Sequence, residues 1–366
     1  MCRSTADGLE ALAYHLTGAE ATTLQALVST AARLGVDVIT GEDWALLVGP
    51  RARLSALARP WTSPEPLVAV AAALGHVLPA DDPLLWQTAR GPLSLDRPLI
   101  VGILNVTPDS FSDGGRFASV DAALVRAEQL LESGATILDV GGESSRPGAQ
   151  PIAETEELAR VIPVIEAIDR RFRQSVKSVQ SVDTVKANVA RRALDVGAAI
   201  VNDVSGLRLD PAMAAACGER NAGVILAHSR GEAGELASLE HAAYPSGVLS
   251  EVAAELAQSI AAARAGGIVA DHLVVDPGLG FGKTAEQNVE LLRGLGTLRV
   301  LGRPILVGPS RKRFLGTLTG REVRERDVAT AAACALAWES GARLFRVHEP
   351  GPARDALAVA EAVRPR

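Results

Sequence analysis

The sequence has little cysteine, no long apolar run and no excess of positive charge, and each absence excludes a class of protein. Its 366 residues include three cysteines, Cys2, Cys217 and Cys334. They are scattered and odd in number, so they fit neither a disulfide framework nor a zinc site. A reducing cytoplasm is therefore the expected compartment.

Membrane and nucleic-acid proteins are the next classes to be excluded. No uninterrupted apolar run approaches the roughly 18 residues of a membrane span, and the first residues, MCRSTADGLEAL, lack the apolar block of a signal peptide. The formal net charge is −6 at pH 7, so there is no general basic surface for nucleic acid. An anionic ligand would need positive charge gathered locally.

From about residue 99 onward one structural unit recurs along the chain. A helical segment ends at glycine, which suits a helix C-cap. A short apolar run follows and ends in polar residues, as expected of a buried parallel strand. The eight strand-bearing segments are Pro98–Leu104, Ser133–Glu143, Ser178–Asp183, Val196–Gly206, Asn221–Arg230, Asp271–Lys283, Arg303–Lys312 and Gly341–Glu349. The helices expected between them include Asp121–Ser133, Thr155–Arg170, Thr184–Val196, Leu249–Ala265, Glu286–Leu295 and Arg326–Ser340.

This rhythm predicts an α/β protein built on a (β/α)₈ TIM barrel. Eight alternating units in about 265 residues match the ~250 residues that such a barrel takes. A doubly wound open sheet is the alternative that the same alternation allows. Residues 91–366 are predicted to form the barrel, and GPLSLDRP (Gly91–Pro98) is predicted to be a short hairpin closing its bottom.

Residues 1–90 do not share the rhythm. An apolar strand candidate lies at Trp44–Val48 and a helix candidate at Pro66–Leu74. We therefore expect a small N-terminal α/β appendage. It contains neither a metal-ligand spacing nor a glycine-rich phosphate loop, so its sequence indicates no chemistry.

Polar side chains gather where the predicted strands end. In a (β/α)₈ barrel the C-terminal ends of all strands face one mouth, where the reactive groups lie. The residues at these positions are Asn105, Asp139, Asp183, Asn202, His228, Asp276, Ser310–Lys312, Arg346 and His348. An aspartate at such a position can also be a helix N-cap or a turn former. The N-cap alternative stays open for Asp183, and the turn alternative for Asp139 and Asp276. So many unlike polar groups at equivalent positions favour a ligand site.

The donors and acceptors of this set indicate the kind of ligand. Asp183, Asn202 and Asp276 would suit a flat heterocycle with a guanidine-like N–H edge beside an amide, because such an edge meets a carboxylate with two hydrogen bonds. Lys312 would add a cation against a ring carbonyl.

A second group of residues suits a phosphate-bearing substituent. It consists of Asn105, Ser145, Arg146, Arg346 and His348. Mg²⁺ often binds with few protein oxygens while phosphates and waters complete its shell, so the single amide oxygen of Asn105 would suffice.

Long sequence motifs show a family resemblance. Pro92–Val363 resembles the dihydropteroate synthase family, whose first and second loops look like NVTPDSFSDGG (Asn105–Gly115) and DVGGESSRPGA (Asp139–Ala149). Further matching strings are Asp183-Thr184, Asn202-Asp203, DPGLGFGK (Asp276–Lys283), SRK (Ser310–Lys312) and RVH (Arg346–His348). The family joins 6-hydroxymethyl-7,8-dihydropterin diphosphate to p-aminobenzoate in folate synthesis. The resemblance implies a (β/α)₈ fold, Mg²⁺ and a homodimer.

The resemblance also implies roles for individual residues. Pterin binding falls to Asp183, Asn202, Asp276, Lys312 and Phe281. The p-aminobenzoate pocket falls to Phe111, Ser145, Arg146, Pro147, Ser310 and Arg311. Diphosphate binding falls to Asn105, Arg346 and His348, and Asn105 is also the Mg²⁺ ligand. The expected catalytic residues are Asp139, Asp183, Lys312 and Arg146, of which Asp139 and Asp183 would stabilise a cationic methylene as diphosphate departs.

The chain departs from the family pattern at several positions. After the fifth strand the family usually carries a His-Met-Gln-Gly-like segment, whereas here His228 is followed by Ser229 and Arg230. This change affects one wall of the pterin slot, and Arg230 would add a cation at the mouth or point to solvent. Arg313 replaces a common serine and Glu349 a common aspartate.

Two other functions are compatible with parts of this pattern. A catalytically silent paralogue would suit the altered fifth-strand loop and the extra N-terminal region. A pterin-binding methyltransferase would share the barrel and a similar Asp/Asn pterin clamp, but would not need the SRK loop, the RPGA loop or the RVH segment. The presence of every charged group expected for catalysis favours the synthase.

Overall fold

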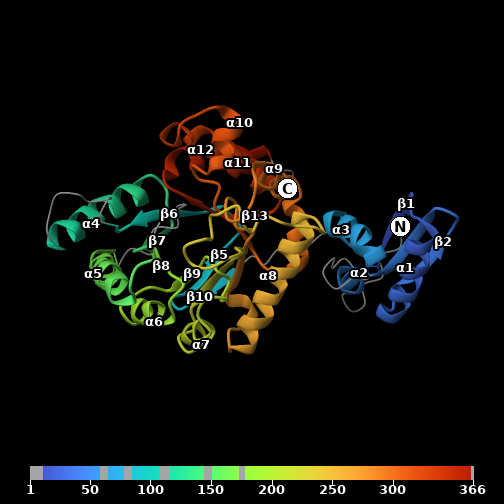
Figure 1. Ribbon diagram of the computed structural model, residues 1–366, viewed down its shortest axis with the longest axis horizontal. Coiled ribbons are helices and arrows are strands. Elements are labelled where there is room, and N and C mark those ends of the chain that lie inside the picture. Colours follow the sequence, from blue (N-terminus) through green and yellow to red (C-terminus); the bar gives the residue numbers. More distant parts are fainter. Residues whose placement is uncertain are drawn as a thin grey trace.

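The computed structural model describes residues 11–57, 65–77, 85–107, 116–143, 151–172 and 178–363. Eight parallel strands form a closed barrel, with β13 hydrogen-bonded to β6 to complete the ring (Figure 1). The strands are β6 (Leu99–Asn105), β7 (Ile137–Gly141), β8 (Val179–Asp183), β9 (Ile200–Asp203), β10 (Gly223–Ala227), β11 (Leu273–Asp276), β12 (Ile305–Val307) and β13 (Ala342–Val347). The predicted (β/α)₈ barrel is confirmed, and the open-sheet alternative is wrong because the sheet closes.

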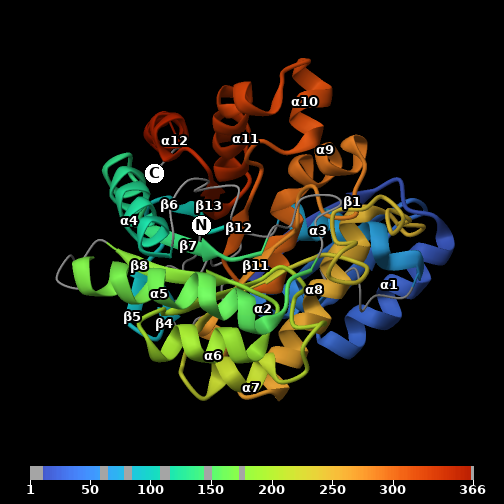
Figure 2. The same cartoon turned by 60° about the vertical axis from the view of Figure 1, so that its left-hand side comes forward.

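Helices surround the barrel strands (Figure 2). They are α4 (Arg116–Glu132), α5 (Glu154–Phe172), α6 (Ala187–Asp195), α7 (Met213–Gly218), α8 (Val248–Ala265), α9 (Ala285–Arg293), α10 (Arg313–Thr319), α11 (Asp327–Glu339) and α12 (Pro350–Val363), with 3₁₀ turns at η4 (Ala270–His272), η5 (Leu295–Leu301) and η6 (Val323–Glu325). In α5 the buried Val161, Val164, Ile165 and Ile168 recur at helical spacing and face the sheet. The six predicted helices correspond to α4, α5, α6, α8, α9 and α11. Among the described residues, no helix combines the length and the apolar character needed to cross a bilayer.

A hairpin closes the end of the barrel opposite the mouth. It consists of β4 (Leu85–Thr88) and β5 (Gly91–Ser94), so it begins earlier than the predicted Gly91–Pro98. Trp86 is fully buried among the apolar side chains of the barrel interior, and its Nε1 donates to the carbonyl of His272, 2.8 Å away. Because His272 precedes β11, the hairpin lies at the N-terminal ends of the strands. The predicted boundary between residues 90 and 91 falls in its turn.

The N-terminal region has a core of its own. Its elements are β1 (Ala11–Thr17), α1 (Ala21–Leu34), β2 (Asp37–Thr40), β3 (Trp44–Pro50), α2 (Arg51–Leu57), η2 (Glu65–Leu67) and α3 (Val68–Val77), and the strands form an antiparallel sheet in the order β1-β3-β2. Leu27, Leu47 and Leu54 are fully buried together, and Val300 of η5 packs against their cluster. This region, blue in Figure 1, is therefore an α/β unit that contacts the barrel beside η5.

Candidate active site

The strand register brings four residues into one row across the mouth. Asn105 at the end of β6 is paired with Gly141, Gly141 with Asp183, and Asp183 with Asn202. On the next strands, Ala227 at the end of β10 is paired with Asp276. Because parallel strands in register end at the same edge, the predicted Asn105, Asp183 and Asn202 lie side by side.

Arg346 joins two carboxylates at the mouth, that of the fully buried Asp139 and that of Asp183, whose side chain is 15% exposed. Its Nε lies 2.6 Å from Asp139 Oδ2, and its Nη2 lies 2.6 Å from Asp183 Oδ2. Asn202 Nδ2 donates to the same oxygen of Asp139 over 3.0 Å. The second oxygen of Asp139, Oδ1, is buried and has no hydrogen-bond partner in the described part of the chain. The pairing thus leaves one carboxylate acceptor unused.

Burial, more than the guanidinium shared by the two carboxylates, sets the protonation of Asp183. Burial raises the pKa of Asp183 to about 7, with Arg346 opposing the rise and Asp139 adding to it. Burial lowers the pKa of Arg346, but the two carboxylates more than offset this and raise it overall. Arg346 therefore stays charged, while Asp183 changes its charge near neutral pH.

Asp276, Lys312 and Phe281 form the opposite side of the mouth. Asp276 Oδ1 accepts from the amide of Gly278 over 2.7 Å, and burial raises the pKa of this carboxyl group. Lys312 Nζ lies 3.8 Å from the centroid of the Phe281 ring, a cation–π contact. Burial also lowers the pKa of Lys312 to about 8. Asp276 is thus buried and Lys312 lies over the Phe281 ring, so the charges of both groups are shielded from water.

The helix-cap alternative for Asp183 is wrong. Helix α6 begins at Ala187, later than the predicted Thr184, and the amide of Ala187 is bound by Asp210 Oδ2 at 2.7 Å. The Asp183 carboxylate instead meets Arg346. Asp276 does fix a turn, through Gly278, so both of its proposed roles are compatible with the structure.

Ser310 and His348 are in direct contact, although the resemblance assigns them to different substrates. Ser310 Oγ lies 2.8 Å from His348 Nδ1 and accepts from the His348 amide over 3.1 Å. The guanidinium of Arg311 forms two 2.8 Å hydrogen bonds with the Asp327 carboxylate of α11. Ser310 and Arg311 are therefore both bound within the protein, and their roles toward p-aminobenzoate remain predictions.

Four predicted residues of the p-aminobenzoate pocket, Phe111, Ser145, Arg146 and Pro147, lie outside the described residues. A cavity beside Asp183 is lined by further residues to which the sequence analysis gave no role in binding or catalysis. Its lining includes Glu143, Glu157, Thr184, Val204 and Leu236.

Lys186 bridges two acids of this cavity. Its Nζ forms ion pairs with Glu143 and Glu157, the latter at 2.5 Å. Glu157 lies on α5 and is 1 % exposed. Sequence reasoning missed it because an acidic residue in the first turns of a helix usually faces solvent.

The altered segment after β10 is fixed by its own contacts. Ser229 Oγ donates to the carbonyl of Val204 over 2.7 Å. Arg230 pairs with Glu251 at 2.7 Å and with Glu255, and its guanidinium stacks 4.0 Å from the centroid of the Tyr244 ring. Arg230 is therefore bound to α8, and with a side chain only 21% exposed it does not simply point to solvent.

The same segment supplies an apolar wall of the mouth. Leu236 is 5 % exposed and packs in one cluster with Val204 and Phe281. Leu236, which comes from farther along the loop, thus provides an aliphatic contact beside Phe281. The loss of the family's usual methionine does not leave this wall open.

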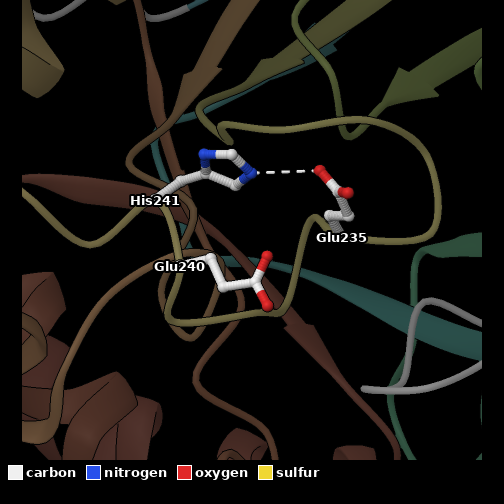
Figure 3. A group of neighbouring side chains, drawn as sticks. All are labelled: Glu235, Glu240 and His241. Carbon is white, nitrogen blue, oxygen red and sulfur yellow. Dashed lines mark hydrogen bonds and ion pairs between the residues drawn. The ribbon is translucent and has the colours of Figure 1, made fainter.

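Glu235, Glu240 and His241 form a second polar group on this segment (Figure 3). Their potential ligand atoms lie within 4.8 Å of one another, and His241 Nε2 is 3.0 Å from Glu235 Oε2. One imidazole with carboxylates suits a transition metal better than Mg²⁺. Since Glu240 is exposed and the imidazole already binds Glu235, we interpret the group as a surface ion pair.

Asn105 fits the predicted role of an Mg²⁺ ligand. A Cβ added at Gly141 would lie 3.7 Å from Asn105 Oδ1 and 3.6 Å from Asp183 Oδ2, so this glycine leaves open space between the two oxygens. The Asn105 side chain makes no hydrogen bond within the described ranges. A free amide oxygen at the rim of an acidic mouth is the hard donor that Mg²⁺ accepts beside phosphate oxygens and water.

Comparison with known proteins agrees with this geometry. Residues 101–348 match the family model described as "Pterin binding enzyme". The dihydropteroate synthase of Synechocystis sp. is 41% identical over 73% of this chain and 90% of that protein. The enzyme of Bacillus subtilis is 40% identical over 69% of this chain and 84% of that protein.

Solved structures give the same result. Xanthomonas albilineans dihydropteroate synthase with 4-aminobenzoic acid superimposes with a TM-score of 0.70 at 44% identity, over 76% of this chain and 98% of that chain. The same enzyme in complex with 7,8-dihydropteroate gives a TM-score of 0.66 at 42% identity, with the same coverage. The chain belongs to the dihydropteroate synthase family of pterin-binding enzymes.

Proposed function

We propose that the protein is an active dihydropteroate synthase. It joins 6-hydroxymethyl-7,8-dihydropterin diphosphate to p-aminobenzoate and releases diphosphate. The observation that carries this proposal is the convergence of Asp139, Asp183, Asn202 and Arg346 in one hydrogen-bonded group at the barrel mouth. A related enzyme has been solved with 4-aminobenzoic acid and with 7,8-dihydropteroate. A silent paralogue would have no need to keep this charged group complete.

The pterin ring is bound through its N–H edge. Asp183 and Asp276 offer carboxylate oxygens, and Asn202 offers an amide. Asp183 Oδ2 contacts Arg346, which leaves Oδ1 for the ligand. Lys312 lies above the Phe281 ring, where its ammonium can meet a ring carbonyl while Phe281 supports the flat heterocycle.

The reaction breaks the C–O bond between the pterin methylene and the diphosphate. The electron pair leaves with the diphosphate, and the methylene becomes cationic before the aniline nitrogen attacks it and loses a proton. The carboxylates of Asp139 and Asp183, both largely shielded from water, stabilise this positive charge, because Coulomb interactions are strong where water is excluded. Arg346 and His348, close together at the end of β13, bind the departing diphosphate.

We also propose Mg²⁺ as the cofactor, held by the Asn105 amide oxygen together with substrate phosphates and water. When bound, it would neutralise charge on the leaving diphosphate as a Lewis acid. The aminobenzoate pocket is assigned to Phe111, Ser145, Arg146, Pro147, Ser310 and Arg311. A weakly nucleophilic aniline needs positioning more than a strong base.

A cytoplasmic homodimer is the proposed state of the protein. On α11, the buried Cys334 and Trp338 face the barrel core, whereas Val328 and Leu336 are 80% and 68% exposed. Leu318 and Val323 add further exposed apolar area on the neighbouring turns. An apolar face of this kind is typical of a protein–protein contact, and a second copy is its proposed occupant.

The Asp183→Asn variant tests the proposed function. It keeps the shape of the side chain but removes the charge, so dihydropteroate formation should fall by about 100-fold or more while the fold is retained. Asp355→Asn, at an exposed position on α12, is the matched control and should retain full activity. Near-normal turnover by the Asp183 variant would remove Asp183 from the pterin clamp. A wild-type protein that binds the dihydropterin without turnover would favour the silent paralogue.

A further inference from the structure

Lys283 is a buried cation that the mechanism above does not use. It ends the loop after β11 and is only 3 % exposed. Its Nζ lies 2.9 Å from the carbonyl of Phe281, 3.1 Å from the carbonyl of Gly278 and 2.9 Å from His228 Nδ1. An ammonium has three N–H donors, so these three acceptors satisfy it fully within the protein.

The loop is wrapped around this ammonium and cannot easily adopt another shape. Gly278 and Gly280 have φ values of +68° and +80°, in the left-handed region that glycine accepts. A Cβ at Gly278 would lie 1.8 Å from the carbonyl oxygen of His228. Asn288 Oδ1 of α9 accepts from the amide of Gly280 over 2.7 Å. Lys283 and Asn288 therefore both hold the loop.

A chain of charged and polar groups links Lys283 to α8. His228 Nε2 lies 3.0 Å from Glu255 Oε2. Since His228 Nδ1 accepts from Lys283, the imidazole proton lies on Nε2 and is donated to Glu255. Arg230 binds the same carboxylate from the other side. Donors and acceptors thus alternate without conflict from Arg230 to Lys283.

The protonation of these groups agrees with the hydrogen-bond directions. Burial lowers the pKa of His228 to about 4, which keeps the imidazole neutral at pH 7. Burial opposes ionisation of Glu255, but the hydrogen bonds from His228 and Arg230 bring its pKa down to about 2. Burial also lowers the pKa of Lys283 to about 7, although Asp276 opposes the shift, so below about pH 7 a charged ammonium donates to the neutral imidazole.

The loop held by Lys283 carries two groups of the candidate active site. Phe281 presents its ring to Lys312, and the amide of Gly278 fixes the Asp276 carboxylate. We propose that Lys283 is a positioning residue for the dihydropterin side of the site, and that Arg230 sets its place through Glu255 and His228. This inference rests on the proposed function for the identity of the ligand. In this inference Arg230, which stands where the family commonly has glutamine, positions Glu255 and through it His228 and Lys283.

Lys283→Met tests the inference by two independent measurements. Hydrogen exchange of the Gly280 and Phe281 amides should speed up by about tenfold or more, because bonds to a charged donor are lost, while exchange in the barrel strands stays unchanged. The dissociation constant for dihydropterin diphosphate, measured by calorimetry, should rise by a similar factor. The KM for p-aminobenzoate should stay within about twofold of the wild type.

A matched pair at His228 separates positioning from general damage. His228→Asn keeps an acceptor close to the place of Nδ1 and should retain most of the dihydropterin affinity, whereas His228→Leu removes it and should behave like Lys283→Met. This pair decides the question if Lys283→Met does not fold. Arg230→Gln should show a smaller loss, and Arg264→Gln, exposed on the same helix, should show none.

Unchanged loop exchange and unchanged dihydropterin affinity in the folded Lys283→Met or His228→Leu protein would overturn the inference. Equal losses for both substrates would also overturn it, because they would indicate general damage. The proposed function fails separately, if the wild type binds dihydropterin diphosphate and forms no dihydropteroate. Exchange and calorimetry need no turnover, so they still test Lys283 in that case.

Discussion

Replacing Arg346 by methionine should make the stability of the protein depend on pH above neutrality. Methionine fills a similar volume but removes the guanidinium that lies 2.6 Å from both Asp139 and Asp183. Breaking a buried ion pair by removing one partner costs about 3–5 kcal/mol. The loss arises because a buried carboxylate is left without a cation.

The pH dependence follows from the pKa of Asp183. In the wild type this pKa is raised to about 7, mainly by burial. In the unfolded chain it returns to about 3.9. Between these values the folded state binds more protons at Asp183, so the contribution of Asp183 to wild-type stability falls as pH rises and levels off above pH 7. Without Arg346, which lowers the pKa in the wild type, the folded-state pKa of Asp183 rises further. The fall in stability then continues above pH 7, by about 1.4 kcal/mol per pH unit for one proton.

Urea unfolding at pH 5.5, 7.0 and 8.5 measures this difference. Between pH 7.0 and 8.5 the gap between Arg346→Met and wild type should widen by about 2 kcal/mol, which is 1.5 units at 1.36 kcal/mol each. The double variant Arg346→Met/Asp183→Asn serves as the control and should lose most of this widening. Parallel stability curves for wild type and Arg346→Met across the three pH values would refute the reasoning.

Two further substitutions test the proposed Mg²⁺ site and the hairpin β4–β5 that closes the end of the barrel opposite the mouth. Asn105→Ala should raise the Mg²⁺ concentration needed for half-maximal turnover by about tenfold or more. The control variant Asn221→Ala should leave that concentration unchanged. Equal Mg²⁺ dependence of wild type and Asn105→Ala would show that Asn105 is not a metal ligand. Trp86→Ala should lower the free energy of unfolding by about 3–5 kcal/mol, because a fully buried ring leaves a cavity in the barrel interior. The control variant Leu85→Ala, at an exposed position on the same strand, should lower the free energy of unfolding by less than about 0.5 kcal/mol. A small shift of the urea midpoint for Trp86→Ala would show that the hairpin does not close the barrel interior.

The barrel could be predicted from sequence because its signals are local. Each strand is a short apolar run between a glycine and polar residues, and eight such runs leave few topologies open. The mouth followed from the same reasoning, since every parallel strand delivers its last residue to one edge. Asn105, Asp183 and Asn202 lie in one register row for this reason.

The pairing of charges could not be predicted, because it joins residues far apart in the chain. Nothing near Arg346 in the sequence indicates Asp139, 207 positions away. The same holds for Lys283, whose partner His228 precedes it by 55 positions on another strand end. Glu157 looked like a solvent-facing helix residue, whereas it is buried and paired with Lys186 of another element.

The most direct test of the central claim measures diphosphate and dihydropteroate in the same sample of purified protein. Supplied with dihydropterin diphosphate, p-aminobenzoate and Mg²⁺, the protein should form the two products in equal molar amounts. Omission of any one component should stop both. Diphosphate released without a matching amount of dihydropteroate, or no product from a protein that binds the dihydropterin, would contradict the account.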